Sequence, residues 1–216
     1  MAFSDLASAA SSSSDSPLEA SIEHRILSET ALLIESGTTW HALSIRQITD
    51  RAQISRTAFY DFFRSKNDVL RHLVSTLDLE LTSYITPSGE TIVVDPNAGV
   101  PELLSVTTRF FAKNGVVYRA FLDASTEDPE LDALWEEMLA GYLSFVSIAI
   151  DGFRRTHPTA PSEPASCDLA KVLVMMTERV MLMMLRRPLD DHRTVIDALQ
   201  VVWLRSIYAA PNSPTA

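Results

Sequence analysis

Apolar residues recur at helical spacing along most of this 216-residue chain, and this pattern predicts an all-α protein. The first helix is expected to begin at Pro17, because proline suits a first helical position, and to end at Gly37. A longer helix is expected from Lys66 to about Tyr84, where leucine and valine side chains share one face. Further helices are predicted over approximately residues 101–113, 116–124, 129–155, 168–185 and 190–208.

Serine N-caps divide the segment from Ser44 to Lys66 into short helices. Ser44 precedes Gln47 by the spacing of a capping box, and Ser55 and Ser65 can cap two further helices. Six apolar residues can pack these helices together: Ile45, Ile48, Ala52, Ile54, Phe59 and Phe63. The basic residues are expected to point outward: Arg46, Arg51, Arg56, Arg64 and Lys66. Two short helices joined by a tight turn predict a helix-turn-helix unit.

Prolines and glycines cluster at residues 86–101, which predicts a loop between two domains. The only strand-like segment, residues 91–94, lies inside that loop. The Ser- and Ala-rich start of the chain shows no periodicity and is expected to be disordered. The expected organisation is a disordered tail (1–16), a helix-turn-helix domain (17–66), a linking helix (67–85), a second helical domain (86–210) and a tail (211–216).

Composition excludes several classes of protein. Apolar residues make up 46% of the chain, which excludes a wholly disordered protein. The single cysteine, Cys167, excludes an internal disulfide, and the five histidines show no helical pairing for a metal, so we expect neither metal nor cofactor. No apolar run is long enough to cross a bilayer and no signal peptide is evident, which predicts a cytoplasmic protein with no membrane partner.

Net charge alone argues against a nucleic-acid partner, because it is −10. The charge is unevenly distributed, however. Residues 44–72 carry six basic side chains against three acidic ones, whereas residues 76–216 carry 11 basic against 19 acidic. A basic helix-turn-helix unit on an acidic body is typical of a DNA-binding protein whose body stays away from the phosphates.

Two stretches of sequence resemble the TetR family of transcriptional repressors. The first is ISRTAFYDFFRSKNDVL at 54–70, preceded by LSIRQITDRA from Leu43. The second, DLAKVLVMMTERVMLMML followed by VIDALQVVWLRSIY, is similar to a subgroup of that family, the repressors of ethionamide activation. The likeness covers residues 17–210. It implies an N-terminal three-helix DNA-binding domain and a larger helical domain for ligand binding and dimerisation.

Within that family the recognition helix and its flanks bind DNA. By position, the family's backbone contacts fall on Ser44, Arg46, Tyr60 and Lys66, and its major-groove contacts on Ser55, Arg56 and Thr57. General physics agrees with these roles, because amides and a cap hydroxyl at a helix start can bind phosphate, and arginine can hydrogen-bond guanine.

Three departures from the family pattern bear on DNA affinity. Gln53 replaces the usual turn glycine, so it must adopt a turn conformation, such as a left-handed one, at a cost of about 1 kcal/mol. Ala58 replaces a threonine that usually contacts the backbone. Asp61 puts an acid on the recognition helix, where it either reads a cytosine amino group or pairs with Arg64 or Lys66.

The resemblance also implies a small-molecule site among the C-terminal helices. Its candidate lining residues are Leu103, Val106, Thr107, Phe110, Phe111, Trp135, Met138, Tyr142, Val174, Thr177 and Trp203. Val174 and Thr177 stand where the ethionamide-related repressors have asparagines, which predicts a more apolar site. The methionines of 175–184 are either core or dimer filler or an adaptable lining, and Cys167 is expected to be a buried, inert thiol.

The sequence therefore favours a homodimeric repressor that a small hydrophobic effector releases from a double-stranded DNA operator. The alternative is a ligand-binding dimer of the same fold with weak or no specific DNA binding, given Ala58 and Asp61. An enzyme is not expected, because the sequence has no nucleophile elbow, no phosphate-binding glycine loop and no recognisable carboxylate pair.

Overall fold

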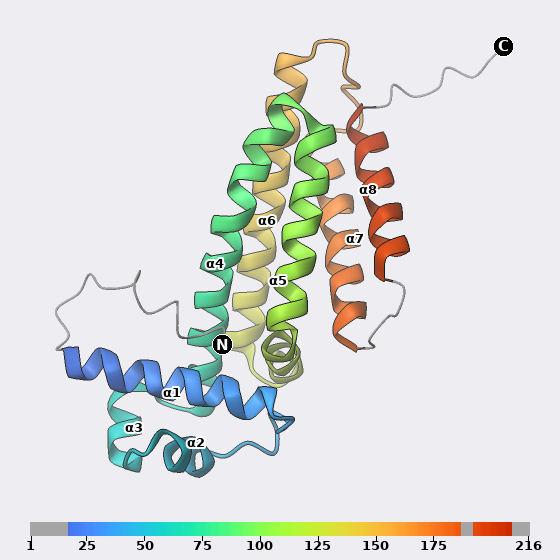
Figure 1. Ribbon diagram of the computed structural model, residues 1–216. Coiled ribbons are helices and arrows are strands. Elements are labelled where there is room, and N and C mark those ends of the chain that lie inside the picture. Colours follow the sequence, from blue (N-terminus) through green and yellow to red (C-terminus); the bar gives the residue numbers. More distant parts are fainter. Residues whose placement is uncertain (1–16, 187–191, 209–216) are drawn as a thin grey trace. The chain divides into compact units, whose positions relative to one another are not determined.

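The computed structural model describes residues 17–186 and 192–208, and in those residues all regular structure is helical (Figure 1). The all-α prediction is thus confirmed. In this described part there are eight helices: α1 (Pro17–Glu35), α2 (Ile45–Ala52), α3 (Arg56–Phe62), α4 (Lys66–Val94), α5 (Pro96–Ser125), α6 (Pro129–Thr156), α7 (Ser166–Arg186) and α8 (His192–Tyr208). The tails expected at 1–16 and 211–216 lie outside the described residues.

Two compact units share these helices. The first comprises Met1–Leu77 and Lys113–Trp135, and the second Asp78–Ala112 and Glu136–Ala216. The first unit therefore holds α1–α3, the first turns of α4, the end of α5 and the start of α6. The second holds the remainder of α4–α6 together with α7 and α8.

The expected loop at 86–101 is wrong. α4 continues through Pro87 to Val94, and α5 begins at Pro96, so Asp95 alone separates them. Pro96 stands at the first position of α5, where no amide donor is required. The amide of Asn97 donates to Asp95 Oδ1 at 3.0 Å, which caps the new helix.

Glycines in this region serve close packing. A Cβ on Gly99 would lie 2.5 Å from the backbone nitrogen of Ile92, and one on Gly89 would lie 2.5 Å from the Phe145 ring. These glycines therefore let helices approach closely inside the second unit. The strand-like segment 91–94 is part of α4. The loop was predicted because prolines and glycines cluster here, and such a cluster does not show whether the glycines serve a turn or close packing of helices.

The two helices predicted at 101–113 and 116–124 are likewise one, α5. A glycine inside a helix costs only about 1 kcal/mol relative to alanine. Burial of Val117, Tyr118 and Phe121 at 2% exposure or less offsets that cost, so the helix passes Gly115 without a break.

α1, α2 and α3 pack around a small core in the first unit (Figure 1). Ile26, Ile48 and Phe59 are completely buried, and Leu43 and Phe63 are nearly so. α1 ends at Glu35, two residues before the predicted stop at Gly37, which has a φ of 96° and donates its amide to the Ile34 carbonyl at 3.0 Å.

α6 is the one described helix that has the length and mean hydropathy to cross a membrane, contrary to the expectation of no such segment. Its C-terminal part packs inside the second unit, where a Cβ on Gly152 would meet the Val93 side chain at 2.8 Å. A packed bundle helix meets the same criteria of length and composition, so they alone do not indicate a membrane span.

Candidate nucleic-acid interface

The capping box predicted at the start of α2 is present. Ser44 Oγ accepts from the Gln47 amide at 3.3 Å, and Gln47 Oε1 accepts from the Ser44 amide at 2.9 Å. Both side chains are exposed. The first turn of α2 is thereby fixed, and the hydroxyl of Ser44 lies at the surface.

The turn between α2 and α3 is left-handed at Gln53, with φ 53° and ψ 48°. The amides of Gln53 and Ile54 both bond to the Thr49 carbonyl, which closes the end of α2. The left-handed conformation expected for this non-glycine residue is thus observed, at a cost of about 1 kcal/mol.

α3, the expected recognition helix, begins at a second cap. Ser55 Oγ accepts from the Ala58 amide at 3.0 Å, while Arg56 and Thr57 are exposed in the first turn. Arg56 Nη2 lies 3.5 Å from the hydroxyl of Tyr60, which is 49% exposed. A hydrogen bond of that length is weak, so both groups are available to another partner.

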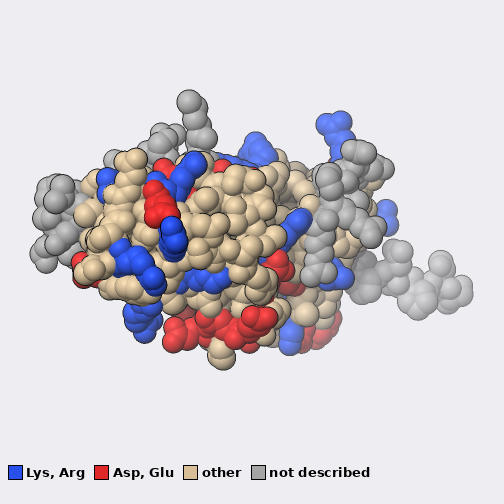
Figure 2. Space-filling view, turned by 90° about the horizontal axis from the view of Figure 1, so that it is seen from below, with Lys and Arg blue, Asp and Glu red and all other residues tan. Residues whose placement is uncertain are grey.

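Arg46 is also weakly engaged. Its Nε lies 3.5 Å from Asp50 Oδ2, and the two side chains are 83% and 70% exposed. Such a surface ion pair contributes at most about 1 kcal/mol and is easily exchanged for a phosphate. Figure 2 shows the face seen from below in Figure 1, where α2 and α3 lie, and basic, acidic and uncharged side chains are interspersed on it.

Lys66 does not point outward as expected. Its ammonium donates to the carbonyls of Trp40 at 2.8 Å and Leu43 at 3.0 Å, and lies 5.2 Å from the centre of the Trp40 ring. Burial lowers the pKa of Lys66, with nearby Glu127 acting in the opposite direction. Two of its three N–H groups thus hold the segment before α2 against the start of α4. Contact of Lys66 with DNA stays a prediction.

Arg51 and Arg64 are exposed, as expected, and each also has an acidic partner within the first unit. Arg51 Nε lies 2.7 Å from Glu29 Oε2 on α1, and Arg64 Nη2 lies 3.6 Å from Glu130 Oε2. Asp61 is exposed, and no ion pair joins it to another residue in the part of the chain that the structure describes. The suggested salt bridge of Asp61 with Arg64 or Lys66 is therefore absent.

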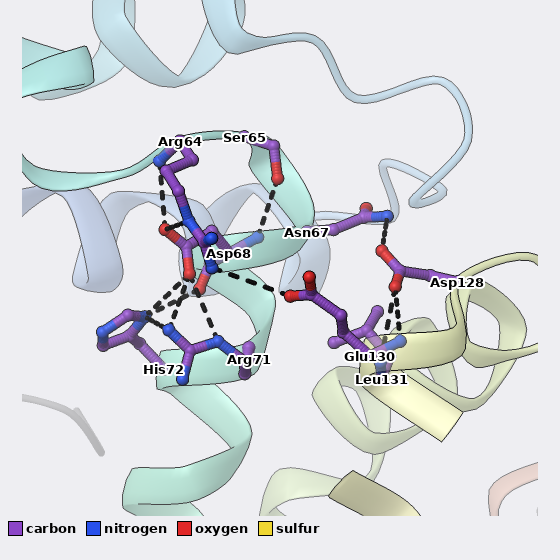
Figure 3. A network of polar contacts seen from close by, with 9 residues as sticks. All are labelled: Arg64, Ser65, Asn67, Asp68, Arg71, His72, Asp128, Glu130 and Leu131. Atoms are coloured by element: carbon purple, nitrogen blue, oxygen red, sulfur yellow. Dashed lines mark hydrogen bonds and ion pairs between the residues drawn. The ribbon is translucent and has the colours of Figure 1, made fainter. Parts of the chain in front are cut away.

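Asp68 is the centre of a polar network that sequence reasoning missed (Figure 3). Its side chain is 8% exposed and accepts from the Arg64 amide at 3.0 Å and from Arg71 Nη2 at 2.7 Å. His72 Nδ1 lies 2.8 Å from the Asp68 carbonyl, which requires a proton on that nitrogen. Burial alone would raise the pKa of Asp68, but the bonds from Arg64 and Arg71 lower it below the ordinary value.

The network extends to the α5–α6 connection, still inside the first unit. Asn67 Nδ2 donates to Asp128 Oδ2 at 2.6 Å, and a cleft of about 240 Å³ lies beside these residues. The only sequence signal was the N-cap predicted at Ser65, which is confirmed by a 3.1 Å bond from the Asp68 amide to Ser65 Oγ.

The proposed ligand-lining residues are mostly in the second unit. Leu103, Phe110, Phe111, Met138, Val174 and Trp203 are buried there, and Val106, Thr107, Tyr142 and Thr177 are half-buried. Trp203 Nε1 donates to Thr177 Oγ1 at 3.1 Å, so α7 and α8 are joined at two of these positions. Trp135 belongs instead to the first unit, with its ring 6.2 Å from that of Phe121.

Tyr142 has a polar partner that the sequence did not indicate. Its hydroxyl donates to Asp78 Oδ1 in α4. Burial raises the pKa of Asp78; the bond from Tyr142 opposes this, and nearby Glu137 adds to it. Burial likewise raises the pKa of Glu178 in α7, with Arg179 opposing and Glu136 adding to it.

The methionines of α7 divide between two environments. Met181 is 1% exposed and belongs to the core, whereas Met175 and Met183 are nearly half exposed. Cys167, expected to be buried, is exposed in the first turn of α7. The helix start places it at the surface, which hydrophobicity alone did not indicate.

Family models match both parts of the chain. The model "Transcriptional regulator EthR, C-terminal domain" matches residues 101–209, slightly more than half of the chain. The model "Bacterial regulatory proteins, tetR family" matches residues 30–73. The HTH-type transcriptional regulator EthR of Mycolicibacterium smegmatis is 27% identical over 196 residues, covering 90% of this chain and 89% of its own. The resemblance found in the sequence is thereby confirmed.

Solved structures have the same fold. A TetR-family transcriptional regulator from Pectobacterium atrosepticum gives a TM-score of 0.66 at 15% identity, covering 92% of this chain and all of its own. The SmeT–triclosan complex gives a TM-score of 0.69 at 16% identity, covering 91% of this chain and 98% of SmeT.

Proposed function

The chain belongs to the TetR family of DNA-binding transcriptional regulators, a non-enzymatic family, and from that premise we propose that it is a homodimeric repressor released from its operator by a small apolar ligand. Such a protein acts in the cytoplasm, where its DNA is. The observation that carries the proposal is the capped start of α3, where Arg56 and Tyr60 are exposed and only weakly bonded to each other.

The geometry of this face supports the proposed DNA contacts. α3 presents Ser55, Arg56 and Thr57 in its first turn, so they are the residues proposed to enter the major groove. Ser44, Arg46 and Tyr60 flank that turn on the exposed side and are proposed to bind phosphates, with Lys66 contributing at most its third N–H group.

Dimerisation is proposed through α7 and α8. Val172, Met175 and Met183 follow one another on α7 at helical spacing and are between 46% and 56% exposed. Val195, Val201 and Val202 of α8 are between 36% and 48% exposed. A second copy of this chain is the proposed occupant, because two-fold pairing of such faces buries both stripes and spaces two DNA-binding heads for two half-sites.

The effector is proposed to bind among the buried aromatic and aliphatic side chains of α5–α8 in the second unit. Support comes from the EthR-type family model that covers these helices and from SmeT, a protein of the same fold whose structure contains triclosan. An effector releases DNA only to the extent that it binds the non-DNA-binding conformation more tightly than the DNA-binding one.

A footprint tests the repressor proposal. We expect purified protein to protect two symmetric half-sites in the DNA flanking its own gene, with an affinity that falls steeply as salt rises. Native mass spectrometry of the same sample should give a dimer, and any co-purified ligand should appear as an added mass. Absence of protection in low salt would contradict the proposal.

A second candidate is a ligand-binding dimer that binds DNA poorly. It is favoured by Ala58, which offers no hydroxyl, and by Asp61, which is exposed on α3 without an ion pair among the described residues. Weak binding of equal strength to every duplex tried, together with a tightly bound ligand, would support this candidate over the repressor.

A further inference from the structure

Three side chains that are far apart in sequence form a continuous hydrogen-bonded line in the first unit. Trp40 Nε1 donates to Asn67 Oδ1 at 3.1 Å, and Asn67 Nδ2 donates to Asp128 Oδ2 at 2.6 Å. We propose that this Trp40–Asn67–Asp128 relay positions the DNA-reading helices, which makes Asn67 and Asp128 positioning residues for DNA binding.

One end of the relay holds the segment that leads into α2. Trp40 is 4% exposed and lies four residues before Ser44, the N-cap of α2. The first two residues of α4 hold this segment together: Lys66 bonds to its carbonyls, and Asn67 bonds to its indole. The direction in which α2 starts, and with it the direction of α3, therefore depends on Asn67.

The other end of the relay is the N-cap of α6. Asp128 Oδ1 accepts from the amides of Glu130 at 2.9 Å and Leu131 at 3.4 Å, while its Oδ2 accepts from Asn67 (Figure 3). The Asp128 carboxylate thus caps the first turn of α6 and accepts a hydrogen bond from Asn67 at the same time. A shift of that turn would move Asn67, and Trp40 with it.

A parallel contact is much weaker. Arg64 and Glu130 approach within 3.6 Å, but their side chains are 74% and 73% exposed, and pairs of that kind contribute little. The Asn67–Asp128 bond is short, charge-assisted and part-buried, so it is the stronger link between the start of α4 and the start of α6.

Exchanging the side chains of Asn67 and Asp128 distinguishes a positioning role in DNA binding from a general effect on stability. In Asp128→Asn the new side chain still caps α6, because asparagine is a good N-cap, but its NH2 faces the NH2 of Asn67. Turning the Asn67 amide over would only set its NH2 against the Trp40 indole N–H. In Asn67→Asp two carboxylates face each other. The double variant restores every bond, because the carboxylate introduced at position 67 can accept both from the Trp40 indole and from the amide introduced at position 128.

The measurement is fluorescence-anisotropy titration of the protected operator duplex, with thermal unfolding recorded on the same samples. Each single variant should bind the duplex at least about tenfold more weakly, which is the loss expected when a charge-assisted bond is replaced by two like groups. The double variant should return to within about threefold of the wild type. Asp132→Asn, an exposed acid in the same turn, is the matched control and should bind normally.

The indole signal of Trp40 in a proton–nitrogen NMR spectrum gives an independent readout, assigned from Trp40→Phe. Its exchange with solvent should become faster in Asp128→Asn than in the wild type, and the slow exchange of a firmly hydrogen-bonded indole should return in the double variant, where the acceptor is a carboxylate. Wild-type affinity in either single variant would overturn the proposal, as would a double variant that binds as weakly as the singles. The inference rests on the DNA-binding role proposed above, and failure of the wild type to bind any duplex would overturn that role instead.

Discussion

The basic residues on two sides of the helix-turn-helix region (α2, α3 and the start of α4) differ in how firmly they are bonded to other protein groups. On the outer face of α2 and α3, Arg46 and Arg56 have only a surface ion pair at 3.5 Å and a weak bond to Tyr60. At the joint between α3 and α4, Lys66 and Arg71 are committed to short bonds with carbonyls or with Asp68. On the outer face the arginines can therefore exchange their weak partners for DNA phosphates, whereas at the joint the basic residues keep their protein partners.

This difference shows that a local excess of positive charge overestimates the number of basic side chains that are available to bind DNA. The charge of residues 44–72 counts every basic side chain equally. Part of it balances buried acids and carbonyls, and only the remainder can exchange its partner for a phosphate at little cost. Variants of Arg46 and Arg56 on the outer face should change DNA binding without changing stability, and variants of Asp68 at the joint should change stability.

The largest effect is expected from Asp68→Asn. The substitution leaves the Arg64 amide and the Arg71 guanidinium with a neutral partner, so the free energy of unfolding at pH 7 should fall by about 2–3 kcal/mol. Urea denaturation measures it. Asp50→Asn, which breaks only the exposed pair with Arg46, is the matched control and should cost less than about 0.5 kcal/mol.

The difference in free energy of unfolding between wild type and Asp68→Asn should depend on pH in a defined direction. The pKa of Asp68 is lower in the folded than in the unfolded chain, so its stabilisation is complete above the unfolded-state pKa and is lost as pH falls through the folded-state pKa. The gap between wild type and Asp68→Asn should therefore narrow in acid. A gap that stays constant down to that range would contradict the assignment.

Tyr60→Phe should weaken operator binding about fivefold, because the variant loses one phosphate donor on the outer face. Anisotropy titration measures the loss. The midpoint of urea unfolding should not change, since the hydroxyl makes only the weak 3.5 Å bond to Arg56. A lower midpoint would show that the outer face is less independent of stability than proposed.

Asp61→Asn should strengthen binding about threefold, because it removes an exposed negative charge from α3 that has no ion pair among the described residues. The gain should disappear in high salt. Weaker binding that is confined to duplexes with a particular cytosine would instead show that Asp61 reads a base.

The smallest effect is expected from Asp78→Asn in the second unit, which sharpens the contrast with Asp68. Asp78 has one donor, Tyr142, and burial raises its pKa, so ionisation costs folding energy above the folded-state pKa. Removing the charge should raise the free energy of unfolding at pH 7 by less than about 1 kcal/mol, after allowance for solvent screening. The gain should vanish in acid, and a loss of stability at pH 7 would contradict the sign.

Sequence reasoning reached the features that depend on local chemistry. The caps at Ser44 and Ser55 follow from neighbouring residues, and the structure has them. The left-handed Gln53, which the structure also has, was implied by the turn glycine of the family that the sequence resembles. It failed where packing overrides local preference. Gly99 of α5 permits a close approach to Ile92 of α4, and no pattern of turn residues distinguishes that use of a glycine from a loop.

Long-range polar partners were equally out of reach. Asn67 and Asp128 are 61 positions apart, and nothing in either neighbourhood indicates that they meet. The inward direction of Lys66 was missed for a related reason: the carbonyls of Trp40 and Leu43 are 26 and 23 positions away and come within reach of Lys66 only in the folded chain.

The central claim is that the outer face of α3 binds operator DNA, and the most direct measurement of it is the salt dependence of operator affinity for wild type and Arg56→Ala. Arg155→Ala, an exposed arginine of α6, is the control. We predict that Arg56→Ala weakens binding about 10- to 100-fold at fixed salt, while Arg155→Ala and the unfolding midpoint stay unchanged. Equal affinity and equal salt slope in wild type and Arg56→Ala would contradict the account.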